Sequence, residues 1–254
     1  MKSSFFLFTT IILFATFLIN PIFPEPKPYI VASQQKAGSH LLIKLLGMLG
    51  EYRHPAFFFH LDEDNFSSTM IEECWQEGRL PWVHLFCPEM TREYFYNHHA
   101  QFKVISIIRD IRDAYVSFAN MVYKKNPQLT EQEKIDLAFN FKDYFRMSHN
   151  LSLFLNDPRF YVVRFEDLVG PKGGGDKKRQ TQAIYDLAAY IGVPISYAQA
   201  SKYGDKLFGG KTITFRKGQI GSWKKACSRE QKLWLKEHFG DELINLGYEE
   251  DHSW

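Results

Sequence analysis

The sequence of 254 residues has little cysteine, no excess of one charge and no internal repeat. Its three cysteines, Cys74, Cys87 and Cys227, are too few and too scattered for a disulfide scaffold or a zinc site, both of which need clustered ligands. Because 31 Lys and Arg balance 29 Asp and Glu, the net charge of +2 argues against a nucleic acid partner. A hydrophobic content of 45% excludes an intrinsically disordered chain and provides for a large core.

Long hydrophobic runs are also absent, with one exception at residues 5–19. A bilayer-spanning helix needs about 20 apolar residues, and this run reaches that length only when it is extended to Phe23. A secretory signal peptide with Lys2 as its charged end is one alternative, although four prolines follow in place of the small residues of a cleavage site. A hydrophobic helix that caps the domain is another. We expect residues 1–28 to form an anchor and a Pro-rich spacer, with membrane association through residues 5–23.

The remaining residues, 29–254, alternate short apolar runs with helical patterns and are long enough for one domain. Predicted strands are Tyr29–Ala32, Ala56–His60, Trp82–Phe86, Val104–Ile108 and Phe160–Val163. Predicted helices are Ser39–Leu49, Ser67–Glu77, Ile111–Lys124, Glu131–Leu155, Thr181–Ile191 and Arg229–Leu246. This alternation predicts a parallel sheet covered on both faces, with ligands bound beyond the carboxyl ends of its strands.

The first candidate anion site is VASQQKAGSHLLIKLL, residues 31–46, where a strand turns into a helix. A helix N-terminus presents N–H groups and the positive end of the helix dipole. Lys36 adds a charge, Gly38 allows close backbone approach and Ser39 adds a hydroxyl. The order differs from GxxxxGK[ST] because the lysine precedes the glycine. Taken alone, the segment could equally be an ordinary strand-to-helix turn.

The second candidate is KVISIIRDIRDAYVSFAN, residues 103–120. Arg109 follows the apolar strand, and Ser117 lies two helical turns further on, where it can face the same way. Arginine donates to phosphate with two N–H groups, and serine can complete the contact. The alternative is an ion network at the helix start, formed by Arg109, Asp110, Arg112 and Asp113.

The third candidate is TFRKGQIGSWKK, residues 214–225. From Lys206 to Lys225 the chain has six Lys or Arg and no acid. Arg216, Lys217 and Gly218 suit a phosphate held by two cations and backbone N–H groups. Phe215, Ile220 and Trp223 are interleaved with the charges, which argues against a merely solvated face.

Together and in this order, the three segments resemble the sulfotransferases that use 3′-phosphoadenosine 5′-phosphosulfate (PAPS). QKAGSHLL resembles that family's 5′-phosphosulfate loop, commonly PKSGTTWL. RDIRDAYVS resembles its RxxRDxxVS element, and FRKGQIGSW its RKGxxGxW loop. VRFEDLVGPKGGG and LGYEEDHSW resemble stretches of the soluble and bacterial-type branch. The resemblance extends from Tyr29 to Trp254 and implies a three-layer α/β/α domain like that of P-loop NTPases, here preceded by a hydrophobic helix.

The resemblance also implies roles for individual residues. The 5′-phosphosulfate would be wrapped by Lys36, Ala37, Gly38, Ser39 and His40. The 3′-phosphate would be held by Arg109, Ser117, Arg216, Lys217 and Gly218. Three departures lie in the first loop: Gln35 replaces a proline, Ala37 a serine, and Leu41 the tryptophan that usually stacks on adenine. Phe215 is a candidate to cover the purine instead.

Sulfuryl transfer to a hydroxyl also needs a base, and a neutral histidine suits that work. His84 in WVHLFCPEM ends a predicted strand, and the segment resembles the family's KTHLP-type segment with its catalytic histidine. A histidine that serves only the core is the alternative. His60 is the reserve candidate, whereas His98 and His99 are expected at an exposed helix end.

We therefore expect direct in-line transfer, with His84 as the base and Lys36 stabilising charge on the oxygen between sulfate and phosphate. No acidic cluster is placed for a phosphate-bound metal, so we expect a metal-independent reaction. The acceptor would be a small molecule, a lipid or a glycan. Two alternatives remain: a P-loop kinase or nucleotide hydrolase, and a membrane-anchored nucleotide-binding protein without turnover.

Overall fold

The computed structural model describes residues 29–58, 67–84, 88–98, 102–140, 148–209 and 217–254. Its five strands are β1 (Tyr29–Ser33), β2 (His54–Phe58), β3 (Arg79–His84), β4 (Lys103–Ile108) and β5 (Phe160–Arg164). They form one parallel sheet in the order β2-β3-β1-β4-β5. β1 lies at its centre, so the carboxyl ends of β3 and β4 flank the end of β1.

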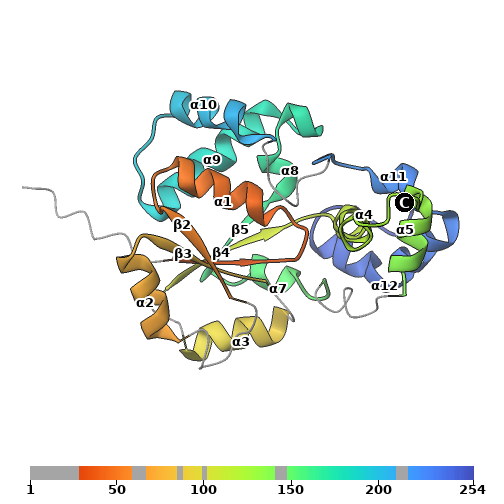
Figure 1. Ribbon diagram of the computed structural model, residues 1–254, viewed down its shortest axis with the longest axis horizontal. Coiled ribbons are helices and arrows are strands. Elements are labelled where there is room, and N and C mark those ends of the chain that lie inside the picture. Colours follow the sequence, from red (N-terminus) through yellow and green to blue (C-terminus); the bar gives the residue numbers. More distant parts are fainter. Residues whose placement is uncertain (1–28, 59–66, 85–87, 99–101, 141–147, 210–216) are drawn as a thin grey trace, which may run out of the picture.

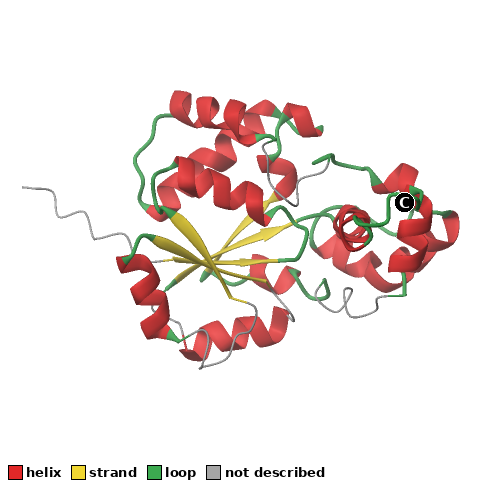
Figure 2. Ribbon diagram, viewed as in Figure 1, coloured by secondary structure: helices red, strands yellow, loops and turns green. Residues whose placement is uncertain are grey.

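Helices cover both faces of this sheet (Figure 1). One face carries α1 (Ser39–Met48), α9 (Lys177–Ile191) and α10 (Tyr197–Leu207). The other carries α2 (Ser68–Gln76), α3 (Pro88–His98) and α7 (Ser152–Leu155). The three-layer arrangement is clear when the elements are coloured by type (Figure 2), and it confirms the predicted α/β/α architecture.

A third group of helices lies beyond the carboxyl ends of the strands. It consists of α4 (Ile111–Val122), α5 (Glu131–Ala138), α11 (Trp223–Ala226) and α12 (Arg229–Asn245). Between β5 and α9 are α8 (Phe165–Leu168) and a short 3₁₀ turn, Pro171–Gly173. Local signals fix several helix starts: Thr130 with Glu133, and Ser228 with Gln231, form capping boxes before α5 and α12.

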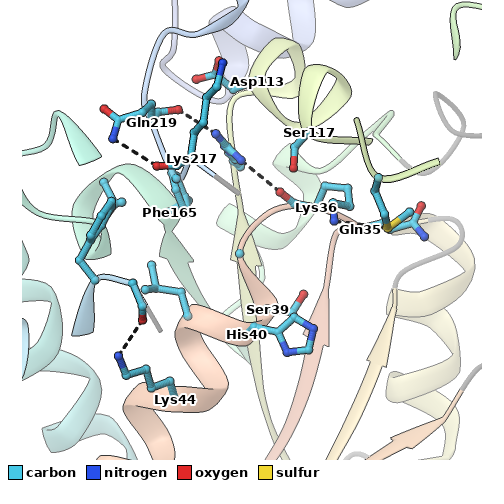
Figure 3. Close-up of a pocket in the computed structure, with 18 of the residues that line it drawn as sticks. Gln35, Lys36, Ser39, His40, Lys44, Asp113, Ser117, Phe165, Lys217 and Gln219 are labelled. Carbon is cyan, nitrogen blue, oxygen red and sulfur yellow. Dashed lines mark hydrogen bonds between the residues drawn. The ribbon is translucent and has the colours of Figure 1, made fainter. Parts of the chain in front are cut away.

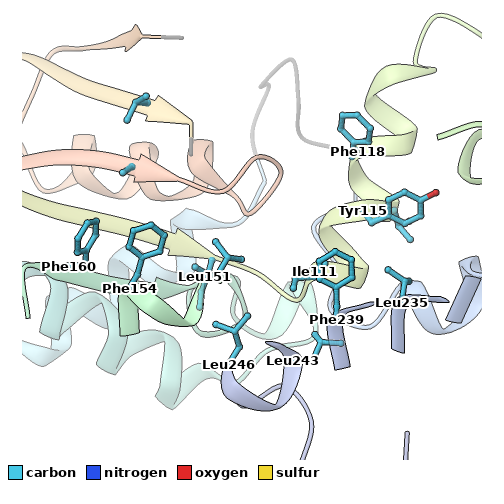
Figure 4. Close-up of a cluster of buried hydrophobic side chains, with 14 of the residues drawn as sticks. Ile111, Tyr115, Phe118, Leu151, Phe154, Phe160, Leu235, Phe239, Leu243 and Leu246 are labelled. Carbon is cyan, nitrogen blue, oxygen red and sulfur yellow. The ribbon is translucent and has the colours of Figure 1, made fainter. Parts of the chain in front are cut away.

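Alternate residues of β1 enter two different cores, as the period of a strand requires. Tyr29 and Val31 pack with α1, α9 and α10, whereas Ile30 and Ala32 pack with the helices of the opposite face. The second core continues past the sheet, where Ile111 and Tyr115 of α4 meet Phe239 of α12 (Figure 4). This packing fixes α4, and with it the residues that face the end of β1.

The prediction of one helix over Glu131–Leu155 is wrong. α5 ends at Ala138 and α7 begins only at Ser152. Asn150 has a φ of 58°, a left-handed conformation that cannot continue a right-handed helix, and residues 148–151 form turns. Both helices pack on the same core, so apolar residues recur at helical spacing in each of them. Periodicity alone therefore predicts one continuous helix. The sequence pattern does not predict α3, α8, α10 or α11.

The proposed anchor and spacer, residues 1–28, lie outside the described residues. Within the part of the chain that the structure describes, no helix has the length and apolar character needed to cross a bilayer.

Candidate active site

A cavity opens where the carboxyl ends of β1, β3 and β4 meet α4 and the segment before α11. It contains about 1040 Å³ of unfilled space that is open to solvent. The first predicted segment lines it with Lys36, Gly38, Ser39 and His40. The second contributes Arg109 and Ser117, the third Lys217 and Gly218, and β3 contributes His84. The structure thus brings residues of all three segments and the predicted base to one cavity.

The loop after β1 owes its shape to two left-handed residues. Lys36 has a φ of 68° although it is not glycine, and Gly38 has a φ of 103° directly before α1. A Cβ on Gly38 would lie 2.6 Å from Cδ2 of Phe165, so only glycine fits there. The Ala37 side chain is buried in the core, and its N–H donates to the Gln34 carbonyl at 3.2 Å. Any role of Ala37 in ligand binding therefore stays a prediction.

Lys36 projects across the cavity toward α4 (Figure 3). Its Nζ lies 3.4 Å from the Met121 sulfur, and its carbonyl accepts from Nη1 of Arg109 at 3.5 Å. A thioether is a weak hydrogen-bond acceptor, so the contact with Met121 is a weak one.

Arg109 is buried, with only 6% of its surface exposed. Its Nη2 donates to the Gln219 carbonyl at 2.9 Å, and its guanidinium carbon lies 4.2 Å from the Phe165 ring centroid. Among the described residues its Nε has no hydrogen-bond partner, and no carboxylate forms an ion pair with it. A buried cation without a counterion is costly. This arrangement can therefore accept an anionic ligand.

The ion network considered as an alternative does exist, but it belongs to Arg112. Its guanidinium pairs with Asp110 at 2.8 Å and with Glu249, and it lies against the rings of Trp223 and Trp254. These contacts join α4 to the C-terminal segment. Arg109 points the other way, into the cavity.

Asp113 fixes the third segment above α4. Its carboxylate accepts from the N–H groups of Gly221 and Trp223, at 2.6 and 3.0 Å, and from the Ser222 hydroxyl at 2.8 Å. This anchoring holds Lys217 and Gly218 at the rim of the cavity. Lys217 is exposed and pairs with Glu131 at 3.1 Å. The other two residues predicted in this segment, Phe215 and Arg216, lie outside the described residues.

His84 ends β3 beside Ser33, the last residue of β1. Its Nδ1 lies 3.3 Å from both the side-chain and the carbonyl oxygen of Ser33. Burial, reinforced by the charge of Lys36 and by His40, lowers the pKa of His84 to about 4, so its ring is neutral at pH 7. His98 is exposed at the end of α3, as predicted, whereas His60 and His99 lie outside the described residues.

Part of the cavity lining is apolar, and sequence reasoning missed most of the residues that form it. These residues are Leu41, Phe165, Leu207 and Phe208. Lys44 ties it together, since its Nζ donates to the carbonyls of Lys206, Leu207 and Gly209 at 2.7–2.9 Å. Phe165 could have been found because it directly follows a strand. Phe208 carries no such signal.

Glu166 supports the turn that carries Arg109. Its carboxylate accepts from the Asp110 N–H at 3.1 Å and from the Tyr248 hydroxyl at 3.0 Å. Burial raises the pKa of Glu166 to about 7. A raised pKa means that the folded state favours the protonated carboxyl. The contribution of Glu166 to the free energy of unfolding is therefore fully present below its ordinary pKa of 4.5, and it is lost as the pH rises through 7.

Glu166→Gln, which stays neutral at every pH, is therefore expected to gain stability relative to the parent protein between pH 5 and pH 8. Urea unfolding at both pH values measures this change, with Glu237→Gln on the exposed surface of α12 as the matched control. A stability difference between variant and parent that is the same at both pH values would contradict the assignment.

Among the described residues, no group of three or more His, Cys, Asp or Glu side chains is placed to hold a metal ion. The expected metal independence of the reaction stays a prediction.

Comparisons with known proteins match most of the sequence to one family and the fold to solved structures. The sequence profile of the family described as "Sulfotransferase domain" matches residues 26–247. Sulfotransferase 6B1 of Danio rerio is 24% identical over 186 residues, which are 65% of this chain and 59% of the relative. The match thus spans less than two thirds of that relative's length.

Two solved structures share the fold. Mouse sulfotransferase SULT7A1, complexed with PAP, has a TM-score of 0.61 and 18% identity over 87% of this chain and 85% of its own. Retinol dehydratase, in complex with androsterone and the inactive cofactor PAP, has a TM-score of 0.57 and 17% identity over 86% of this chain and 81% of its own. At these identities the likeness concerns the fold.

Proposed function

The chain belongs to the sulfotransferase domain family, and from that premise we propose that it transfers a sulfuryl group from PAPS to a hydroxyl or amine of a small-molecule acceptor. One observation carries the proposal: Arg109, a buried arginine without a carboxylate partner among the described residues, shares a cavity with the Lys36 loop and a neutral histidine. Both structural neighbours were solved with PAP, the desulfated form of the same donor.

The residues of the cavity fit such a donor in three parts. Lys36, Gly38, Ser39 and the N-terminus of α1 would hold the 5′-phosphosulfate. Arg109, with Ser117, Lys217 and Gly218, would hold the 3′-phosphate. The adenine would pack against Phe165 and Phe208. These rings would take over the contact that the family's tryptophan makes, since Leu41 stands at that position here.

When bound, the donor supplies a sulfuryl group whose bond to the phosphate oxygen breaks as a bond to the acceptor oxygen forms. His84 takes the proton of the acceptor hydroxyl, which requires the neutral ring that burial provides. Lys36 stabilises the negative charge that grows on the phosphate oxygen as it leaves. Ser39 and the N–H groups at the start of α1 stabilise the sulfuryl oxygens.

Calorimetry with PAP and with ATP tests the donor class. We expect PAP to bind and ATP to bind much more weakly. Preference for ATP would favour a kinase or nucleotide hydrolase instead.

Incubation with labelled PAPS and an extract of host-cell lipids and metabolites then tests turnover. Binding of PAP without transfer to any component of the extract would favour the binding protein without turnover.

Arg109→Lys tests the 3′-phosphate site. Lysine keeps the charge but loses the planar pair of donors, so the preference for PAP over adenosine 5′-phosphate should fall about 10- to 100-fold. Affinity for adenosine 5′-phosphate, which lacks the 3′-phosphate, should change little. Arg79→Lys, at the amino end of β3, is the control. An unchanged preference in Arg109→Lys would remove Arg109 from this role.

A further inference from the structure

Ser33, for which no sequence motif predicts a role, lies at the centre of a hydrogen-bond cluster beneath the cavity. Its side chain is fully buried at the end of β1. The indole Nε1 of Trp82 donates to its hydroxyl at 2.9 Å. The same oxygen lies 2.7 Å from the Ser39 hydroxyl and 3.3 Å from Nδ1 of His84.

The sheet register creates this cluster. β1 and β3 are parallel, and Ser33 is paired with His84, as Val31 is paired with Trp82. Paired residues of neighbouring strands point to the same face, which here is the face covered by α1. Ser39, the first residue of α1, completes the cluster. The proposed base and the hydroxyl of the proposed cradle thus share one partner.

Proton counting leaves this cluster two arrangements. A serine hydroxyl has one proton to donate and two lone pairs, and an indole N–H only donates. Once Trp82 has taken one lone pair of Ser33, one donor and one acceptor position remain for Ser39 and His84. Either Ser33 donates to Ser39 and accepts from Nδ1–H of His84, or Ser39 donates to Ser33 and Ser33 donates to a bare Nδ1.

The two arrangements have opposite consequences at the cavity. In the first, the basic lone pair of His84 is on Nε2 and the Ser39 proton is left for a ligand. In the second, Nε2 carries the proton and the Ser39 proton is already used. The Ser33 carbonyl, 3.3 Å from Nδ1, can only accept, so it favours a proton on Nδ1 and therefore the first arrangement.

We propose that Ser33 is a positioning residue that couples the tautomer of His84 to the direction of the Ser39 hydroxyl. The catalytic meaning of this coupling rests on the proposed sulfuryl transfer. The acceptor proton goes to Nε2, Nδ1 keeps its own proton and donates it to Ser33, and Ser39 donates to a sulfuryl oxygen. The Ser33 hydroxyl then determines both which nitrogen of His84 acts as the base and whether Ser39 can donate to the sulfuryl oxygen.

The tautomer itself provides a readout that needs neither donor nor acceptor. In ¹⁵N-labelled full-length protein at pH 7, imidazole nitrogen shifts should show the proton of His84 on Nδ1, with signals assigned by their loss in His84→Gln. Ser39→Ala does not touch His84, yet it removes the acceptor of the Ser33 proton. Ser33 should then donate to Nδ1, and part of the population should shift to the Nε2–H tautomer.

Ser33→Ala and Ser33→Thr complete the experiment. Ser33→Ala should give mixed tautomers and lower kcat about 10- to 100-fold, the scale expected when active-site hydrogen bonds are lost. The KM for PAPS should change little. Ser33→Thr, which keeps the hydroxyl, should restore both properties. Ser106→Ala is the matched control, because Ser106 is equally buried on neighbouring β4 and its hydroxyl has no partner among the described residues.

The outcomes separate the coupling from the proposed function. An unchanged His84 tautomer in Ser39→Ala overturns the coupling, even if Ser33→Ala fails to fold. A kcat in Ser33→Ala equal to that of Ser106→Ala overturns its catalytic role. If the tautomer responds as expected but PAP does not bind, the coupling stands and the proposed function fails.

Discussion

Replacement of Lys36 by methionine is expected to lower kcat about 10²- to 10³-fold, the scale seen when one group that stabilises developing charge is removed. Methionine preserves much of the length and apolar contact of the side chain but has no charge. The ammonium lies in the cavity on a loop whose left-handed residue at position 36 fixes the backbone. Its contribution therefore increases as negative charge accumulates on the leaving phosphate oxygen.

The effect should fall mainly on kcat, because Arg109 and the N-terminus of α1 still bind the two ends of the donor. Steady-state kinetics with labelled PAPS and an acceptor identified from the extract measure kcat and KM separately. Lys103→Met is the control. Lys103 begins β4 at the amino ends of the strands, away from the cavity, and it donates to the Tyr190 carbonyl. A variant of Lys36 with a raised KM and unchanged kcat would show that the lysine only binds ground-state charge.

Sequence patterns predicted the parallel sheet and the place of the site because both depend on local signals. Apolar runs of strand length marked β1 and β4, and the polar residues after them, Lys36 and Arg109, lie at the carboxyl edge as expected. Parallel strands bring these ends together whatever the intervening sequence does. The motifs around Lys36 and Arg109 then predict that this end of the sheet binds the phosphosulfate and phosphate groups of PAPS.

Other parts of the site depend on tertiary packing that no local pattern encodes. The sequence pattern is compatible with Asp113 as a member of an ion network at the helix start, but its carboxylate holds the backbone of the third segment. Phe208 reaches the cavity because Lys44, more than 160 positions earlier, binds the carbonyls around it. The role inferred for Ser33 depends on the register between β1 and β3, and strand sequences alone do not fix that register.

Replacement of His84 by alanine is expected to lower kcat about 10²- to 10⁴-fold, the range for losing a general base. The binding of PAP should be retained, because the residues expected to contact its phosphates lie on the loop after β1, between β4 and α4, on α4 and before α11. Calorimetry with PAP and kinetics with labelled PAPS separate the two effects. Activity within a few-fold of the parent protein would remove His84 from the role.

The pH profile provides the stronger test of this base, because burial and the Lys36 charge together hold its pKa near 4. Since the neutral ring is the active form, kcat/KM of the parent protein should decline only as the pH falls toward 4, and His84→Ala should lack that limb. The negative charges of a bound donor favour the imidazolium, so the acid limb of kcat should lie at higher pH than that of kcat/KM. Lys36→Met removes a neighbouring positive charge and should move the kcat/KM limb upward as well. A limb that stays in place in Lys36→Met would mean that the titrating group does not lie beside Lys36.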